Sequence, residues 1–482
     1  MKKNNSTTSG LLWSFSERFG AQLISLIVSL ILARLLMPSD YGIVVTVSIF
    51  INIANAFVTG GFGNSLIQKK DADDLDFSTI FWFNILFSLL IYAGVFVLSP
   101  FVESFYEQEG LAFVMQILGI RLIFTGVNSV QRAYVARKME FKKFFFATLA
   151  GTVISAVIGI LMAIKGYGVW ALVTQYLINT TVDTIVLFAV NKWRPKFIFS
   201  FQRLKQLLSY GWKLLISSVL SAIYVELNEF VIGKVYSTDD LAFYNKGKQI
   251  PSLISTNVIS AIETVLFPSM SMIQDEKSRL KEKTRKSIQF STFFIFPMLF
   301  GLAAVANTFI VVILTEKWAY AVPYMMLACI SFMLNPIGMA NLQAYKAMGK
   351  SGLYLGLDIA KKMIGIIALI VCLRYGVLAI AIGVVVGNFI GFFLNIIPNR
   401  KYLNYGLFEQ IKDILPTFII ALLMFIIVYM ENYIPINNIL LLLIQIITGV
   451  TVYCLLAIFT RNKTLFEVRN LIRGVKKQNE QI

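Results

Sequence analysis

The 482-residue sequence contains no histidine, only three cysteines and few charges, and each scarcity excludes a class of function. Without imidazole, histidine acid–base catalysis and histidine-ligated metals are excluded. Cys329, Cys372 and Cys454 lie within apolar stretches at spacings that suit neither a disulfide framework nor a metal site. No ATP-binding P-loop is present, and the glycine cluster at 60–63 predicts a helix kink or a close-packing point. We therefore expect no metal and no cofactor.

What the sequence has in abundance is apolar residues. It is 57% hydrophobic and 14% charged, with a mean hydropathy of +0.73, which is typical of a polytopic membrane protein. The apolar segments are too long for barrel strands, so we predict an all-α protein with about fourteen transmembrane helices. One of them, 241–273, is long enough to be tilted or broken near Pro251 or Pro268. The predicted spans are 11–36, 41–67, 77–99, 111–136, 144–164, 168–190, 209–233, 241–273, 287–314, 320–345, 353–373, 377–397, 413–430 and 436–460.

The distribution of Lys and Arg predicts how the chain is oriented in the membrane. With a cytoplasmic N-terminus, the cytoplasmic segments hold 30 basic residues and the opposite loops hold four, so both termini are expected in the cytoplasm. The net charge of +17 is then mostly a topology signal, and we expect membrane lipids rather than nucleic acid as partners.

An internal repeat divides the chain. A displacement of 199 residues places Trp13 on Trp212 and 39–40 on 238–239 without a gap, and 166–172 resembles 374–380. Six predicted spans separate the copies, so both halves have the same orientation. We predict two parallel six-helix bundles, 1–200 and 201–400, followed at 401–482 by an extra transmembrane pair and a basic cytoplasmic tail.

Four predicted spans carry a narrow polar face at helical spacing. Such faces are typical of interhelical hydrogen bonds or of the wall of a polar cavity. The faces consist of Ser14, Arg18, Gln22, Ser25 and Ser29; of Ser48, Asn52, Asn55 and Thr59; of Arg121, Thr125, Asn128 and Arg132; and of Lys213, Ser217, Ser221, Tyr224 and Asn228.

The arginines on these faces are costly to place in a bilayer. A charge at its centre costs at least about 2.5–3.5 kcal/mol. Arg18, Arg121 and Arg132 therefore either line a water-filled cavity or pair with Glu17 or Asp183. Charges close to span ends, such as Lys246 and Lys362, are expected to reach the membrane surface. Guanidinium groups suit phosphate, so the excess of cations favours an anionic cargo.

Three stretches carry a resemblance to a known family. They are WSFSERFGAQLISLIVSLILARLLMPSDYGI at 13–43, AYVARKMEFKK at 133–143 and GYGVWAL at 166–172. They resemble Wzx-type polysaccharide repeat-unit flippases, in the polysaccharide transporter branch of the multidrug/oligosaccharidyl-lipid/polysaccharide exporter superfamily. The resemblance implies two six-helix bundles around a central cavity, cationic cavity residues and alternating access.

The resulting hypothesis is a non-enzymatic flippase of a bacterial plasma membrane. It would move an anionic polyprenyl-(pyro)phosphate-linked oligosaccharide from the cytoplasmic to the outer leaflet. We expect a monomer that works with the polymerase and glycosyltransferases of its pathway. The alternatives are a cation-coupled drug antiporter of the same fold, using Glu17 or Glu226, and a membrane polymerase or ligase of lipid-linked sugars. The predicted cavity residues are Arg18, Arg121, Arg132, Lys213, Gln22, Asn52 and Asn128, with Glu17 as the candidate for ion coupling.

Overall fold

A computed structural model describes residues 20–69 and 71–467 of the chain, and within these ranges every regular element is a helix. This confirms the all-α prediction. Each of the fourteen predicted spans contains a described helix. Eleven of the described helical segments are long and apolar enough to cross a membrane. The helix Gly20–Leu35 is shorter, and α10 and α15 are not among the eleven, so the number fourteen stays a prediction.

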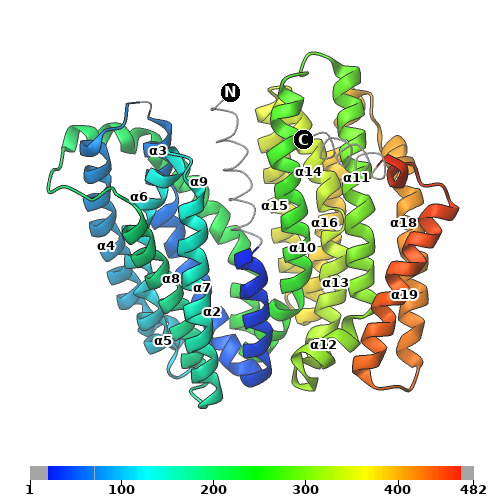
Figure 1. Cartoon of the computed structure of the whole chain (residues 1–482), viewed down its shortest axis with the longest axis horizontal. Coiled ribbons are helices and arrows are strands. Elements are labelled where there is room, and N and C mark those ends of the chain that lie inside the picture. Colours follow the sequence, from blue (N-terminus) through cyan, green and yellow to red (C-terminus); the bar gives the residue numbers. More distant parts are fainter. Residues whose placement is uncertain (1–19, 70, 468–482) are drawn as a thin grey trace, which may run out of the picture. The chain divides into compact units, whose positions relative to one another are not determined.

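Contacts between helices divide the chain into two compact units, the first extending to Ala242 and the second beginning at Phe243. The helices of the first unit run back and forth along its length (Figure 1). After Gly20–Leu35 they are α2 (Pro38–Thr59), α3 (Phe62–Gln68), α4 (Asp74–Tyr106), α5 (Leu111–Gly119), α6 (Arg121–Arg137), α7 (Phe141–Ile164), α8 (Val169–Val190) and α9 (Phe201–Val235).

Small residues let several of these helices approach closely. A Cβ added to Gly61 would lie 2.2 Å from the carbonyl oxygen of Gly211, and one added to Gly126 would lie 2.5 Å from Ser88 Oγ. The Gly61 contact joins the start of α3 to α9. It makes the glycine cluster both an interruption between α2 and α3 and a close-packing point, as its composition predicts.

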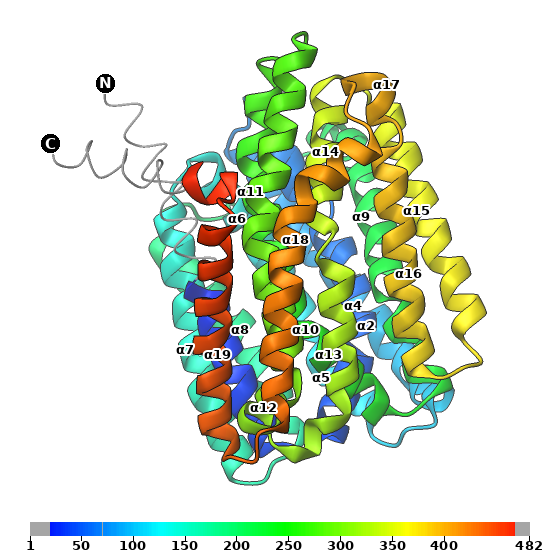
Figure 2. The same ribbon diagram turned by 90° about the vertical axis from the view of Figure 1, so that its right-hand side faces the viewer.

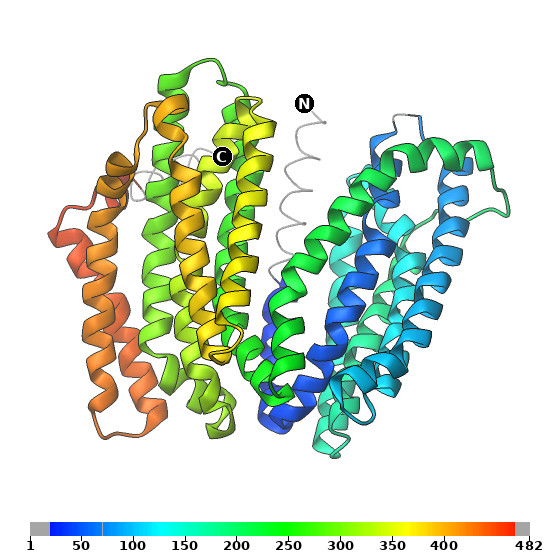
Figure 3. The same cartoon turned by 180° about the vertical axis from the view of Figure 1, so that it is seen from behind.

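The helix α9 packs with the first unit, although the repeat predicts that it opens the second bundle. It lies along α2, α3 and α4, as the view from behind shows (Figure 3). Ser218 Oγ donates to the carbonyl oxygen of Gly60 over 3.3 Å, and Tyr106 Oη donates to that of Phe230 over 3.3 Å. Packing therefore divides the chain near Ala242, whereas the division between 200 and 201 stays a prediction about the repeat.

The second unit contains the remaining helices. They are α10 (Thr238–Ser271), which begins at the end of the first unit, α11 (Lys277–Ala304), α12 (Ala306–Leu314), the short η1 (Glu316–Ala321), α13 (Val322–Phe332), α14 (Asn335–Ala347), α15 (Ser351–Cys372), α16 (Val377–Ile396), α17 (Asn399–Leu403), α18 (Leu407–Met430), η2 (Glu431–Tyr433) and α19 (Asn438–Phe459). Of the two expectations for 241–273, a tilt or a break near Pro251 or Pro268, the break does not occur: α10 continues through both prolines. The tilt stays a prediction.

The two helices predicted as an appended pair, α18 and α19, lie against α11 in the second unit (Figure 2). Ion pairs at one end of α18 fasten it there. Lys281 Nζ lies 2.8 Å from Glu409 Oε2, and Arg285 pairs with Asp413, whose side chain is only 5% exposed. Tyr405 Oη donates to the same Asp413 carboxylate over 2.8 Å. The pair is thus held to its unit by charges as well as by apolar packing.

Candidate functional site

The charged face predicted for 111–136 lies on α6, which starts after an interruption at Ile120. Arg121 is the first residue of this helix, and its carbonyl oxygen accepts a hydrogen bond from Thr125 Oγ1 over 2.9 Å. Arg132 lies eleven residues further on, which is about three helical turns and about 16 Å along the axis. The two arginines therefore share one face of α6 at two different depths.

Arg132 and Asn128 converge on the carboxylate of Asp183 in α8. Arg132 Nη2 lies 2.9 Å and Asn128 Nδ2 2.6 Å from Asp183 Oδ2. Thr148 of α7 donates to Asp183 Oδ1 over 3.3 Å. The Asp183 side chain is 9% exposed, whereas that of Arg132 is 44% exposed. Of the alternatives left open by the sequence for Arg132, the structure shows a pairing with Asp183, with one side of the guanidinium still accessible.

The helix α7 backs this carboxylate. A Cβ added to Gly151 would lie 2.8 Å from the carbonyl oxygen of Asn179 and 3.4 Å from Asp183 Cβ, so α7 and α8 touch at this level. The ring of Phe144 lies 5.4 Å from the Arg132 guanidinium carbon, within the range of a cation–π interaction. Asp183 and Arg132 are thus held by α6, α7 and α8 together.

Arg121 has a different environment. Its guanidinium carbon lies 5.7 Å from the centre of the Tyr176 ring on α8, and its side chain is half-buried. Among residues 20–69 and 71–467, no carboxylate lies within ion-pair distance of Arg121. One face of α6 therefore holds a neutralised arginine and, about 16 Å away, an arginine that contacts an aromatic ring.

The other predicted cavity residues do not join this cluster. Asn52 Nδ2 donates to Glu226 Oε1 over 3.1 Å, between α2 and α9. Gln22 is half-buried, and its Oε1 has no hydrogen-bond partner in the described part of the chain. Lys213 is exposed on α9. Arg18 and Glu17 lie outside the described residues, so their roles stay predictions.

The sequence did not single out Tyr176 or Thr148, because an isolated tyrosine or threonine in an apolar span carries no signal of its own. Tyr176 lies seven residues before Asp183, which is about two helical turns, so the two side chains share one face of the helix. This spacing is the one sequence signal that could have indicated Tyr176. Lys246 differs from the expectation for charges near span ends, because it is buried, with its Nζ 5.8 Å from the Trp318 ring. Lys362 Nζ lies 3.0 Å from Asp358, and its reach to the membrane surface stays a prediction.

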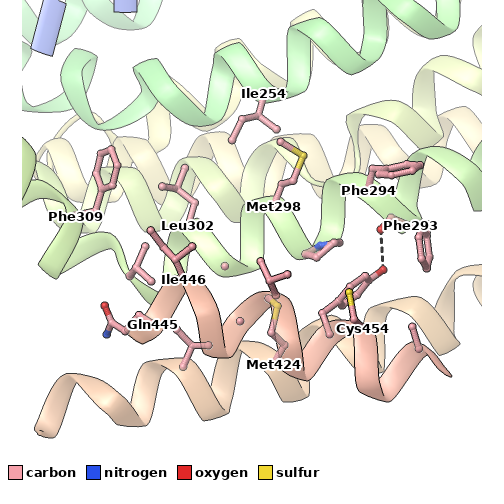
Figure 4. A pocket seen from close by; sticks show the side chains of 18 of the residues that line it. Ile254, Phe293, Phe294, Met298, Leu302, Phe309, Met424, Gln445, Ile446 and Cys454 are labelled. Carbon is pink, nitrogen blue, oxygen red and sulfur yellow. Dashed lines mark hydrogen bonds between the residues drawn. The ribbon is translucent and has the colours of Figure 1, made fainter. Parts of the chain in front are cut away.

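An apolar cavity of about 560 Å³ lies in the second unit, between α11 and the appended helices (Figure 4). Its lining is almost wholly aliphatic, aromatic and sulfur-containing, so it suits a hydrocarbon chain. Gln445 is its main polar residue. Gln445 Nε2 donates to Asn432 over 3.0 Å, and Gln445 Oε1 is buried without a partner among the described residues. Lining residues include Phe293, Met298, Gly301, Phe309, Met424, Ile446, Gly449 and Cys454.

Comparison with known proteins gives one family match. A family model described as "Polysaccharide biosynthesis protein" matches residues 31–323. Among solved structures, the "Lipid II flippase MurJ, inward closed conformation" superposes with a TM-score of 0.75 at 15% identity. It covers 94% of this chain and 99% of that one. An inward-facing multidrug resistance MATE family transporter superposes with a TM-score of 0.62 at 15% identity, covering 80% and 94%. At these identities the structures show a shared fold.

Curated relatives are similar along much of the chain. The succinoglycan biosynthesis transport protein ExoT of Rhizobium meliloti (strain 1021) is 25% identical over 66% of this chain and 65% of its own length. The lipopolysaccharide biosynthesis protein WzxC of Escherichia coli (strain K12) is 25% identical over 80% and 78%. The teichuronic acid biosynthesis protein TuaB of Bacillus subtilis (strain 168) is 26% identical over 61% of each. The matches to ExoT and TuaB span less than two thirds of those proteins.

Proposed function

The chain belongs to the polysaccharide biosynthesis protein family, and on that premise we propose that it is a flippase for a lipid-linked oligosaccharide. The membership confirms the resemblance to Wzx-type flippases that the sequence carries at 13–43, 133–143 and 166–172. The cargo is an anionic polyprenyl-(pyro)phosphate-linked oligosaccharide. It moves from the cytoplasmic to the outer leaflet by alternating access, for cell-surface polysaccharide biosynthesis.

The arginines on one face of α6 carry the proposal of an anionic cargo. A guanidinium presents planar, paired N–H donors that match the oxygens of a phosphate. Arg132 keeps part of its guanidinium accessible beside Asp183, and the described residues place no carboxylate against Arg121. Both positive charges lie in the segment Leu111–Arg137, which is long and apolar enough to cross a membrane, where an unused charge is costly.

The lipid part of the cargo needs an apolar surface. The cavity beside α18 and α19 has a volume of about 560 Å³ and an apolar lining, which suits part of a polyprenyl chain. A charged site for the phosphate and an apolar site for the chain are the two requirements of such an amphipathic molecule. The first unit meets one of them and the second unit meets the other.

The setting follows from the distribution of charge. With the basic loops facing the cytoplasm, both termini lie there and the protein spans a bacterial plasma membrane. It acts as a monomer and carries no catalytic site. The glycosyltransferases that build the lipid-linked unit act before it, and a polysaccharide polymerase acts after it. We further propose that the cargo also contacts Gln22, Asn52, Lys213 and Arg18, and that Glu17 couples flipping to an ion.

Deleting the gene and following lipid-linked repeat units in each leaflet tests the proposal. Repeat units should accumulate in the cytoplasmic leaflet, and the intact gene should restore their export. An unchanged distribution between leaflets combined with altered dye efflux would instead favour a drug antiporter of the same fold. Purified full-length protein in liposomes should also speed the movement of an NBD-labelled polyprenyl diphosphate, measured by protection from dithionite.

A further inference from the structure

Three hydrogen-bond donors from two helices converge on Asp183, and one of them is an arginine that is still partly open to its surroundings. We infer that Asp183 is a positioning residue that aims the Arg132 guanidinium at an anion and moderates the affinity of that site. The anion is a phosphate or diphosphate group. The inference rests on the proposed function, because it assigns how the anionic headgroup is recognised.

The contacts divide the Arg132 guanidinium into a fixed part and an available part. A guanidinium carries five N–H donors in a rigid plane. Among the described residues, Asp183 accepts from Nη2 of Arg132, and no other side-chain acceptor contacts that guanidinium. The remaining donors can bind a phosphate oxygen while Nη2 stays on Asp183. A lysine ammonium has three N–H donors but no rigid planar fork, so it would not hold both partners in this fixed, paired geometry.

The fixed part is held rigidly. Asp183 also accepts from Asn128 and Thr148, so its carboxylate cannot rotate without losing a hydrogen bond. Gly151 brings α7 against the backbone of Asp183, and the Phe144 ring lies beside the guanidinium. A preorganised guanidinium binds its ligand with a smaller loss of side-chain entropy.

The negative charge of Asp183 also weakens the site. It repels a second anion bound to the same guanidinium, so the phosphate binds less tightly than it would to a lone arginine. Moderate affinity is useful in a transporter, because a cargo held too tightly is not released. Arg121, about three turns away on the same face of α6, contacts the neutral ring of Tyr176 and has no such repulsion among the described residues. Arg132 is therefore the weaker and Arg121 the stronger of two binding sites for the same anion.

The test measures the binding of farnesyl diphosphate to the full-length protein by calorimetry, with farnesol as the uncharged control. Flipping of NBD-labelled polyprenyl diphosphate is measured in liposomes. Asp183→Asn keeps the shape of the side chain but removes its charge. We expect it to tighten farnesyl diphosphate binding about tenfold, within the usual range for coupled neighbouring sites, and to lower both the KM and the maximal rate of flipping. A purely structural ion pair would not lower the KM.

Two further variants keep the test decisive. Arg132→Lys retains a positive charge beside Asp183 but loses the forked donors, and we expect about tenfold weaker binding. Asp358→Asn, which breaks the Lys362–Asp358 pair on α15, is the matched control and should leave binding unchanged.

The outcomes separate the two proposals. If the wild type prefers farnesyl diphosphate to farnesol but folded Asp183→Asn does not bind it more tightly, the role of Asp183 is refuted and the flippase proposal stands. If Asp183→Asn does not fold, Arg132→Lys decides: binding of farnesyl diphosphate as tight as in the wild type likewise refutes the role of Asp183 and leaves the flippase proposal standing. If the wild type does not distinguish the two probes, the anionic cargo is refuted, and the inference about Asp183 is refuted with it.

Discussion

Replacing the two α6 arginines by methionine should change the free energy of unfolding differently: Arg132→Met should lower it, whereas Arg121→Met should leave it unchanged or raise it. Arg132→Met leaves the Asp183 carboxylate, which is 9% exposed, without its guanidinium. Arg121→Met removes a half-buried charge that has no carboxylate partner among the described residues. Methionine retains the apolar reach of an arginine stem, so the comparison isolates the charge.

The structure sets the size of the difference. Breaking a buried ion pair by removing one partner typically costs about 3–5 kcal/mol. Arg132 is partly exposed, and Asn128 and Thr148 continue to donate to Asp183, so we expect about 2–3 kcal/mol for Arg132→Met. Arg121→Met should be neutral or stabilising by up to about 1 kcal/mol, because burying an unpaired charge is itself unfavourable.

Thermal unfolding of the purified protein in detergent, followed by size-exclusion chromatography, measures the contrast. A unit of this size changes its Tm by roughly 2–4 °C per kcal/mol, so Arg132→Met should unfold about 5–10 °C below the wild type. The double variant Arg132→Met/Asp183→Asn should recover most of the loss. Both single variants should lose flipping.

Equal destabilisation by the two single variants would refute this reasoning, because it would mean that Arg121 also has a partner of opposite charge. A failure of the double variant to recover stability would show that Arg132 contributes through packing on Phe144 rather than through Asp183.

Three other substitutions have defined outcomes. Gly61→Val should prevent folding, because a Cβ at Gly61 would lie 2.2 Å from the carbonyl oxygen of the facing α9 glycine. Gly94→Val is the control and should be tolerated, because a Cβ there meets open space; the yields of the two variants are compared as fluorescent fusions. Asp413→Asn weakens the ion pair with Arg285 and should cost about 2 kcal/mol in thermal unfolding, and an unchanged Tm would contradict the role of this pair. Gly301→Leu partly fills the apolar cavity and should slow flipping of a long polyprenyl diphosphate about fivefold, while binding of farnesyl diphosphate stays unchanged. Equal effects on both ligands would argue against binding of the polyprenyl chain in this cavity.

The sequence predicts the helices well because their length and apolarity are set by the bilayer, a property of each segment alone. Every predicted span contains a helix in the structure, including α18 and α19, which are predicted as the final pair. Prolines predict the ends of helices less well. Pro251 suggested a break, yet α10 continues through it, because in membrane helices neighbouring groups can compensate for the missing N–H.

Packing partners were not predictable in the same way. Hydropathy makes one apolar helix equivalent to another, so nothing in the sequence indicated that α9 packs with α2 and α4. That choice depends on glycine-sized surfaces, such as those of Gly61 and Gly211, that meet only in the folded chain.

The candidate site was half predictable. Helical periodicity correctly placed Arg121, Asn128 and Arg132 on one element, since all lie on α6. It could not choose between Glu17 and Asp183 as the partner of Arg132, because the answer depends on how α6, α7 and α8 pack. It also could not indicate that Arg121 lies against the aromatic ring of Tyr176.

The ion pair between Arg132 and Asp183 also constrains how the protein is made. The two residues are 51 positions apart, so the ribosome completes α6, α7 and the first part of α8 before it adds the carboxylate. If the arginine entered the lipid during that interval it would be unpaired, which costs at least about 2.5–3.5 kcal/mol for a charge near the bilayer centre. The favourable order is for α6 to remain beside the translocon until α8 arrives, so that the three helices enter the lipid with Arg132 already paired to Asp183.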